Sequence, residues 1–332
     1  MSRSIRLALV LLGVWGTCTL ALAAQATNPF VGRWALTIPG GAAGWLGVVE
    51  KDGKLSGSIL WGGGSVVPVN DVKLDGDKLV VTWIHESPRD RKNTSTQTIT
   101  AMLDGDNLKL TTVTERPDGS QTRPENFTGK RIPPLPPRPD LAKVKFGEPI
   151  GLFDGKHHLE GWKLTHEGTQ NGWSVENGVL VNKPVQQEGK PHINYGNLRT
   201  VAPFEDFHLK LDVKVDKGQN SGVYLRGIYE VQVCDSYQKR LDSHNMGGIY
   251  SRITPTVAAE KPAGEWQTLD LTLVDRHATV KLNGQTIIDN QPLLGCTGGA
   301  LSSDEFKPGP IYLQGDHTGV CYRNITLRPV VR

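Results

Sequence analysis

Polar and aromatic side chains alternate with apolar ones in two short runs of the sequence, a pattern that could hold a sugar. The polar positions of the first run are Glu230 and Gln232, and those of the second are Tyr312 and Gln314. Carboxylates and amides match pairs of sugar hydroxyls, and aromatic faces match the apolar C–H faces of a sugar ring. If both runs are strands of one sheet, these side chains form one surface, with His317 at its edge.

The same alternation has a purely structural explanation, because any antiparallel sheet with one solvated face shows it. Parity alone favours that explanation, whereas the choice of glutamines and tyrosine over Thr and Lys favours binding. Taken singly, His317 is more often a loop histidine than a catalytic base. Asp235 by itself is more often a cap at the end of a strand.

The elements around these residues are predicted to be antiparallel strands. In the run 229–234, the odd positions suit a core and the even positions point outward. The run 222–225 gives Tyr224 the same outward parity, and Arg226 shares it unless Gly227 forms a bulge. Strand patterns recur over residues 148–330 with little helix, which predicts a sandwich of two antiparallel sheets.

Residues 28–131 are predicted to form a separate small module. Asp-Gly pairs recur there between β-rich runs, which is a strong hairpin signal, and no segment has helical periodicity. The pattern predicts an antiparallel, barrel-like domain similar to lipocalins. Core positions are preferred to a ligand pocket for its four tryptophans, which are Trp34, Trp45, Trp61 and Trp83.

A proline-rich linker is predicted over residues 132–147, between the two folded units. Prolines at this density, concentrated in 133–139, enforce extended polyproline geometry and exclude a helix or a central strand. The segment is therefore expected to act as a stiff spacer. A docking site for a proline-reading partner is the weaker alternative.

Residues 1–24 have the features of a signal peptide. Arg3 and Arg6 precede a long apolar run, and Ala21-Leu22-Ala23 offers the small residues that signal peptidase reads. We expect an exported protein, periplasmic or extracellular, with no stable membrane span after cleavage; an uncleaved anchor is the alternative. Cleavage lowers the formal charge from +3 to about +1, a balance that gives no electrostatic attraction to nucleic acid.

Three cysteines follow the predicted signal peptide, namely Cys234, Cys296 and Cys321. Their spacing does not suit a zinc site. They are interpreted mainly as buried small residues, and a disulfide between Cys296 and Cys321 stays an open alternative.

A series of ordered motifs runs through residues 148–330. They include Leu152-Phe153-Asp154-Gly155, Trp173-Ser174-Val175-Glu176-Asn177-Gly178, Asn220-Ser221-Gly222, Tyr229-Glu230-Val231-Gln232-Val233, Gly248-Ile249-Tyr250, Gly264-Glu265-Trp266 and Ile311-Tyr312-Leu313-Gln314. Together they resemble the 3-keto-disaccharide hydrolase family. The chain departs from that pattern in having two residues between Gln314 and His317, where we expect one. The N-terminal module lies outside the resemblance.

The resemblance implies a concanavalin A-like jelly roll that acts on glycosides already oxidised to a ketone at C3. The ketone makes the hydrogen on C2 acidic, so a base can remove it and the C1 substituent can leave by elimination. Addition of water then completes a net hydrolysis of a 3-keto-glycoside or 3-keto-disaccharide. This scheme requires no cofactor from the protein, and its partner is a small-molecule or oligosaccharide substrate.

The resemblance and the outward parity together suggest roles for named residues. The predicted catalytic residues are His317, Glu230 and Asp235. His317 is the base or acid because its free pKa lies near working pH, and either carboxylate could assist it or hold a divalent cation that polarises the ketone. The predicted substrate-binding residues are Arg226, Gln232, Gln314, Tyr250, Asn220 and Arg323, of which the two arginines are candidates to stabilise the enolate. His157, His158, His166 and His244 are interpreted as surface histidines.

Two other functions fit the same residues. A non-catalytic carbohydrate-binding protein of the cell envelope would use Glu230, Gln232 and Gln314 for binding alone. A retaining glycosidase needs two carboxyl groups about 5 Å apart, and Glu230 with Asp235 is the obvious pair. The identity of the sugar, the linkage and any metal is not determined by the sequence.

Overall fold

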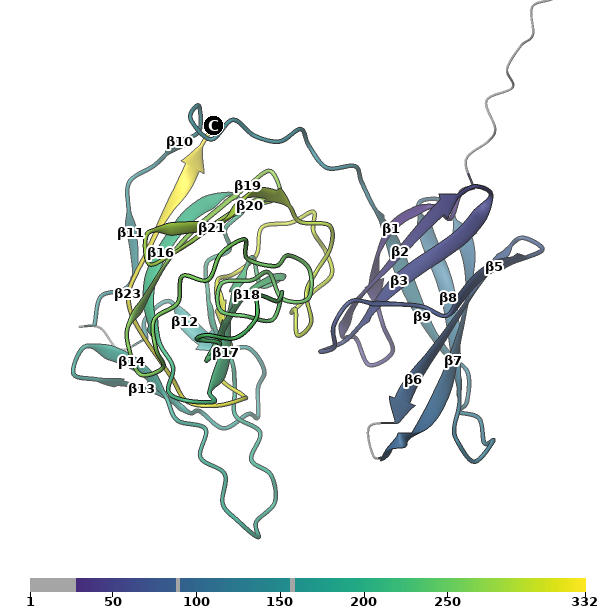
Figure 1. Ribbon diagram of the computed structural model, residues 1–332, viewed down its shortest axis with the longest axis horizontal. Coiled ribbons are helices and arrows are strands. Elements are labelled where there is room, and N and C mark those ends of the chain that lie inside the picture. The colour runs from purple at the N-terminus through teal and green to yellow at the C-terminus, as the bar shows by residue number, and fades with distance from the viewer. Residues whose placement is uncertain (1–27, 88–89, 156–158) are drawn as a thin grey trace, which may run out of the picture.

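The computed structural model describes residues 28–87, 90–155 and 159–332, and the regular elements in those ranges are all β-strands (Figure 1). This confirms the predicted all-β fold class. The predicted signal peptide, residues 1–24, lies outside the described residues. Within the ranges given above, no helix is long and apolar enough to cross a membrane.

The N-terminal half forms one antiparallel sheet in the order β4-β3-β2-β1-β9-β8-β7-β6-β5. The segment between β4 and β5 bonds to both sides of this sheet, because the Val69 amide donates to Gly57 O (3.0 Å) and the Asn70 amide to Thr82 O (2.9 Å). The sheet therefore curls around its own core, and closure into a lipocalin-like barrel stays a prediction. The strands are β1 (Gly32–Thr37), β2 (Ala43–Lys51), β3 (Lys54–Trp61), β4 (Val67–Pro68), β5 (Asp71–Asp75), β6 (Lys78–Ser87), β7 (Asp90–Asp104), β8 (Asn107–Glu115) and β9 (Glu125–Ile132).

The C-terminal half is a sandwich of two sheets, which confirms the predicted jelly-roll architecture. The larger sheet has the order β13-β14-β23-β16-β19-β20-β21, with β10 and β11 also paired to β23. Its strands are β10 (Lys145–Phe146), β11 (Ile150–Phe153), β13 (Trp173–Glu176), β14 (Val179–Asn182), β16 (Phe207–Lys214), β19 (Gln267–Val274), β20 (His277–Leu282), β21 (Gln285–Pro292) and β23 (Val320–Val331). The smaller sheet has the order β12-β15-β22-β17-β18. Its strands are β12 (Trp162–Leu164), β15 (Leu198–Thr200), β17 (Asn220–Leu225), β18 (Tyr229–Cys234) and β22 (Tyr312–Leu313).

The alternation along β18 separates the sandwich core from the outer face, as the sequence pattern predicts. Tyr229, Val231 and Val233 are buried in the core between the sheets. Glu230 and Gln232 have the opposite parity and lie on the other face of the five-stranded sheet. They are nevertheless 3% and 4% exposed, because loops cover this face. The expected wet face is therefore a covered one.

The proline-rich segment runs from β9 to β10 (Figure 1), and it bonds to the C-terminal half along the way. The Arg276 guanidinium donates to Pro134 O at 2.7 Å, and Asn290 Nδ2 donates to Pro139 O at 2.8 Å. Arg138 also pairs with Asp289 at 3.1 Å. Each of these contacts joins residues more than 140 positions apart, so they fix the segment along its length.

Cys234, Cys296 and Cys321 are free, so the disulfide left open between Cys296 and Cys321 is not present; Cys296 is buried, and Cys234 and Cys321 are half-buried. Burial raises the pKa of the Cys296 thiol to about 12, which suits its interpretation as a small core residue. Trp34 and Trp45 are buried, as expected for core tryptophans. Trp45 differs from Trp34 in joining the apolar cluster of the C-terminal half.

Candidate functional site

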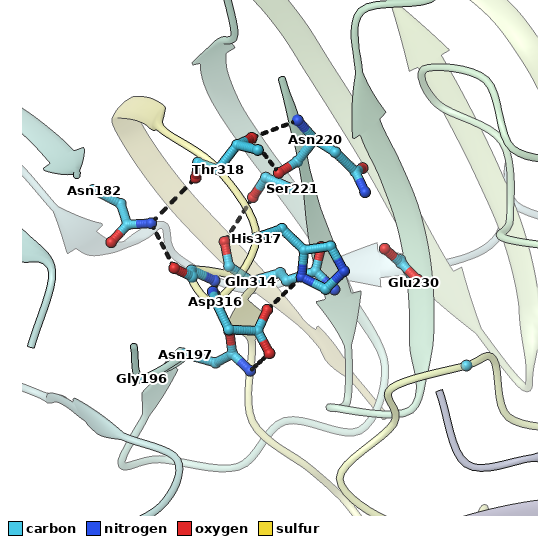
Figure 2. Close-up of polar contacts among 12 residues, drawn as sticks. Asn182, Gly196, Asn197, Asn220, Ser221, Glu230, Gln314, Asp316, His317 and Thr318 are labelled. Atoms are coloured by element: carbon cyan, nitrogen blue, oxygen red, sulfur yellow. Dashed lines mark hydrogen bonds and ion pairs between the residues drawn. The ribbon is translucent and has the colours of Figure 1, made fainter. Parts of the chain in front are cut away.

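A pocket of about 780 Å³ opens over the outer face of the five-stranded sheet. Its lining includes five of the residues predicted from the sequence, namely Asn220, Glu230, Tyr250, Gln314 and His317. They come from β17, β18 and the loops that follow β18 and β22. Figure 2 shows the carboxyl group of Glu230 next to the ring of His317, and both residues line the pocket.

The floor of the pocket is a row of paired residues across three strands. Tyr224 on β17 pairs with Glu230 on β18 and with Tyr312 on β22. The two tyrosine rings stack with centroids 4.2 Å apart and planes inclined by 18°. Because paired residues of neighbouring strands share one face, the sheet itself delivers these three side chains to the pocket.

Glu230 is held beside Tyr224 in a way that favours its protonated form. The Tyr224 hydroxyl oxygen lies 2.9 Å from Glu230 Oε2 and 2.9 Å from Gly298 O. A tyrosine has one hydroxyl hydrogen and a carbonyl oxygen only accepts, so both contacts form at once when Glu230 donates to Tyr224 and Tyr224 donates to Gly298. Burial raises the pKa of Glu230 to about 8, so the carboxyl group is largely neutral at pH 7.

His317 is oriented by its neighbour in sequence. Its Nδ1–H donates to Asp316 Oδ1 at 2.6 Å, which leaves Nε2 directed to the pocket side. The hydrogen bond to Asp316 raises the pKa of His317, against the opposing effect of burial. Burial pushes the pKa of Asp316 upward, but the hydrogen bond and charge of His317 and a bond from Asn197 hold it below its usual value.

The turn that carries His317 is held by two asparagines from other parts of the domain (Figure 2). Asn197, just before β15, accepts from the amides of Gly315 (2.6 Å) and Asp316 (3.0 Å) through Oδ1, and its Nδ2 donates to Asp316 Oδ2 at 3.1 Å. Asn182 at the end of β14 donates through Nδ2 to Gly315 O at 2.8 Å. The extra residue between Gln314 and His317 therefore sits in a defined turn and supplies the carboxylate partner of the histidine.

Two amide side chains present acceptors to a ligand. Gln314 Oε1 and Asn220 Oδ1 are buried, and neither has a hydrogen-bond partner among the described residues. Both residues line the pocket. An unpaired buried oxygen is costly unless a ligand or water satisfies it, so these atoms are suited to accept from sugar hydroxyls.

Arg226 does not reach the pocket, which corrects its predicted placement. It begins the turn after β17 with φ of 57°, and its guanidinium donates to the carbonyl oxygens of Glu305 (2.8 Å) and Lys307. The left-handed backbone there breaks the strand parity on which the prediction relied. Gln232 is on the predicted face, but its Oε1 accepts from the Val233 amide at 2.9 Å and it does not line the pocket.

Asp235 and Arg323 also lie away from the pocket. Asp235 follows the end of β18, where its Oδ2 accepts from the Gly218 amide at 3.0 Å. Arg323 belongs to β23 of the other sheet, where it pairs with Asp212 at 3.1 Å and lies over the Trp266 ring. Asp235 therefore caps the end of a strand, which was the structural explanation weighed for it from the sequence. Arg323 has a structural role on the opposite face of the sandwich.

The two carboxylates named as alternatives for holding a divalent cation, Glu230 and Asp235, do not lie together. Glu230 lies in the pocket with its carboxyl group engaged by Tyr224, whereas Asp235 caps a loop elsewhere. Across the described ranges, no group of three or more His, Cys, Asp and Glu side chains could hold a metal ion. The same separation excludes Asp235 as the second carboxyl group that a retaining glycosidase would need beside Glu230.

Several pocket residues were not predicted as site residues. Tyr224 and Asp316 carried a local signal, since Tyr224 had the right strand parity and Asp316 precedes the histidine. Three other pocket residues are in loops, where no periodic pattern predicts which way a side chain points; they are Asn197, His166 and His192. Two of the other histidines, 157 and 158, lie outside the described residues. His244 is largely exposed and binds Asp242 and Ser65.

Several solved structures are similar to part of this chain. A protein of Parabacteroides distasonis ATCC 8503, named as a candidate glycosyl hydrolase, is 28% identical with a TM-score of 0.44, covering 60% of this chain and 94% of its own. A second protein of that organism with the same name is 22% identical with a TM-score of 0.46. The match covers 55% of this chain and 94% of that protein. A carbohydrate-binding module from Bacillus subtilis is 13% identical with a TM-score of 0.32. The match covers 50% of this chain and 94% of the module. No curated protein matches the chain.

The family comparison is more specific than the structural ones. A family model described as a 3-keto-alpha-glucoside-1,2-lyase-like domain matches residues 148–328, which is more than half of the chain. The match spans both sheets of the sandwich and every strand that contributes to the pocket floor. The chain therefore belongs to the 3-keto-disaccharide hydrolase family of carbohydrate-acting domains, and its N-terminal sheet lies outside the family match.

Proposed function

We propose that this protein cleaves 3-keto-glycosides or 3-keto-disaccharides by abstracting the proton on C2 and eliminating the substituent on C1. The observation that carries the proposal is that one pocket contains both a proton acceptor and a proton donor. His317, oriented by Asp316, has a free ring nitrogen that can accept a proton, and Glu230 is held as a neutral acid that can donate one. Elimination requires one group of each kind.

The proposed reaction balances without a cofactor. His317 Nε2 takes the C2 proton, and the electrons of that C–H bond form the enolate with the C3 ketone. When the enolate collapses, a double bond forms between C1 and C2 and the C1–O bond breaks. Glu230 donates its proton to the departing oxygen. Addition of water across the new double bond at C1 and C2 gives the free 3-keto sugar, so the net reaction is hydrolysis.

The enolate oxygen needs hydrogen-bond donors, and side-chain amides are the available candidates since Arg226 points elsewhere. Gln314 and Asn220 line the pocket, and each carries an NH₂ group as well as its unpaired oxygen. We infer that one amide stabilises the enolate and the other orients a hydroxyl group. The stacked rings of Tyr224 and Tyr312 offer a face for the sugar ring.

The test is aglycone release from a 3-keto-glucoside by the purified protein. We expect turnover by the wild type, and losses of ~100-fold or more in kcat for Glu230→Gln and His317→Ala. Arg323→Ala, on the other sheet, serves as the control and should keep wild-type turnover. No release by the wild type, or full release by both pocket variants, would overturn the proposal. Retention on unmodified glycans without turnover would favour the non-catalytic binding protein.

We further propose that the protein works outside the cytoplasm, as the features of residues 1–24 suggest. Secretion of the full chain from a bacterial host, followed by N-terminal sequencing, tests this directly. A mature protein that starts after Ala23 or Ala24 is the expected result. A chain that keeps its first residues and stays in the cytoplasm would contradict it.

A further inference from the structure

The N-terminal half closes one side of the pocket. Its contribution is the residues Gly40, Gly41 and Ala42 from the β1–β2 turn and Gly63 from the turn after β3, here called the glycine wall. Within the β1–β2 turn the Gly41 amide donates to Ile38 O (2.9 Å) and Ala42 O accepts from the Ile38 amide (3.0 Å), and the other backbone groups of the wall carry almost no side chain. A Cβ atom built at any of the three glycines would meet nothing within 4 Å. The wall therefore leaves open space next to polar backbone groups.

The glycine wall is held rigidly against the family domain. The Arg252 guanidinium lies 4.6 Å from the centroid of the Trp45 ring, and the Val66 amide donates to Ser251 Oγ at 2.7 Å. Ser303 Oγ donates to Leu36 O at 2.7 Å. These contacts come from both sides of the wall in sequence, so the wall is a fixed part of the pocket.

The wall stands at the Glu230 side of the pocket. The Gly299 amide donates to Gly62 O at 3.3 Å, and a Cβ on Gly298 would come within 2.3 Å of Gly64 O, so the two glycine turns pack backbone to backbone. Gly298 O in turn binds the Tyr224 hydroxyl that holds Glu230. In the proposed function Glu230 protonates the departing oxygen, so the departing group lies on this side.

The pocket also has a ligand-binding group away from the glycine wall. Gln314 is only 7% exposed, yet its Oε1 has no partner in the described part of the chain and faces the pocket. The pocket volume of about 780 Å³ lies well inside the range used for drug-sized ligands, which are larger than one hexose ring. A ligand with hydroxyls at both ends would satisfy Gln314 at one end and backbone groups of the wall at the other.

We propose that the glycine wall forms the subsite for the leaving group, and that this group is a second sugar. The inference rests on the proposed function for the choice of side, and it assigns to the N-terminal half a role in substrate specificity. Backbone amides and carbonyls without side chains let a sugar ring approach closely and bind its hydroxyls. The protein is then selective for 3-keto-disaccharides over 3-keto-glucosides with small aglycones.

Substitutions that fill the space beside the wall test this subsite. Ala42→Trp and Gly63→Trp add a bulky ring there, and Gly63 has a backbone conformation that accepts a side chain. The matched controls are Ala142→Trp and Gly151→Trp, two exposed positions outside the pocket lining, the second also with open space for a side chain. The measurement is kcat/KM for a 3-keto-disaccharide divided by kcat/KM for methyl 3-keto-glucoside. We expect this ratio to fall at least tenfold in the wall variants and to stay unchanged in the controls.

An unchanged ratio in the wall variants, or an equal change in the controls, would overturn the subsite while leaving the proposed function intact. If the wild type releases neither aglycone, the proposed function fails, and calorimetric titration then tests the subsite alone. In that case, the wild type should bind an unmodified disaccharide more tightly than glucose, and Ala42→Trp should abolish the difference. Equal binding of the two sugars by the wild type would overturn the inference.

Discussion

At the scale of single residues, the pocket combines two titratable groups, Glu230 and His317, whose surroundings raise the pKa of each. Burial beside Tyr224 keeps Glu230 protonated, with a pKa of about 8, while Asp316 holds His317 by its Nδ1 proton. A carboxylic acid that stays neutral at pH 7 and a histidine with a free ring nitrogen give the enzyme an acid and a base in one pocket. We expect activity to follow a bell-shaped pH profile.

The acidic limb of that profile should depend on Asp316. Because the hydrogen bond to Asp316 raises the pKa of His317, Asp316→Asn lowers it, and the acidic limb of kcat/KM should move to lower pH. The variant should also lose kcat, about tenfold or more, since the ring loses its orienting partner. An NMR titration of the His317 ring measures the same shift without turnover. An acidic limb that does not move would contradict the role of Asp316.

Glu230 should also leave a signature in stability. Its pKa in the folded protein, about 8, lies above the ordinary value of 4.5, so folding favours the protonated form. The free energy of unfolding should therefore fall, from this group alone, by about 1.4 kcal/mol per pH unit from pH ~5 to pH ~8. Glu230→Gln cannot ionise, so denaturant unfolding should show it gaining on the wild type across that window. Parallel pH profiles for the two proteins would refute the assignment of a raised pKa.

At the scale of elements, the strand register determines which side chains share the pocket. Glu230 pairs with Tyr224 and lies diagonally over Gly222, where a Cβ atom would come within 2.3 Å of Glu230 Oε1. Glycine at position 222 is thus the space into which the carboxyl group folds. The residue belongs to the family motif quoted from the sequence, and the register explains why a side chain there would compete with the acid.

Gly222→Ala should therefore affect activity more than folding. The clash is with the end of a flexible side chain, so Glu230 moves and the backbone stays, at a stability cost of about 1 kcal/mol. Displacement of the acid should lower kcat about tenfold. Gly151→Ala, at an exposed strand position with open space, is the control. Wild-type kcat in Gly222→Ala would show that the Glu230 position is not critical.

At the scale of the whole molecule, the two halves share one apolar cluster. Trp45, Leu60 and Ile132 of the N-terminal half are buried in the same cluster as the sandwich core. The proline-rich segment adds to this connection through its bonds to Arg276 and Asn290. The interface that seats Trp45 is continuous with the glycine wall, so domain contact and pocket shape are physically linked.

Removing Trp45 should loosen that contact. Trp45→Ala deletes a buried indole and its stacking with Arg252, which should cost about 3–5 kcal/mol and separate the two halves in part. Small-angle X-ray scattering should show a larger radius of gyration for Trp45→Ala than for the wild type. Trp83→Ala, a half-buried tryptophan of the same sheet outside the shared cluster, should not change it. Equal radii for all three proteins would count against a shared core.

The sequence by itself determined the features that depend on local periodicity. Strand alternation with a period of two is visible in any apolar run, so the all-β class, the core positions of β18 and the outward parity of Glu230 and Tyr312 were predictable. Gln314 followed from the same alternation, and the family resemblance suggested a role for His317. These residues do line one pocket.

The tertiary structure alone decided what depends on loops and on contacts between distant segments. A single left-handed residue turned Arg226 away from the pocket, and membership of the other sheet removed Arg323. The loop at Gly298 converted an expected wet face into a buried one, which is why Glu230 can be an acid. Turn conformation and packing between distant segments produce no periodic pattern in a sequence. The carboxylate that binds His317 and the glycine wall of the N-terminal half could therefore be identified only from the tertiary structure.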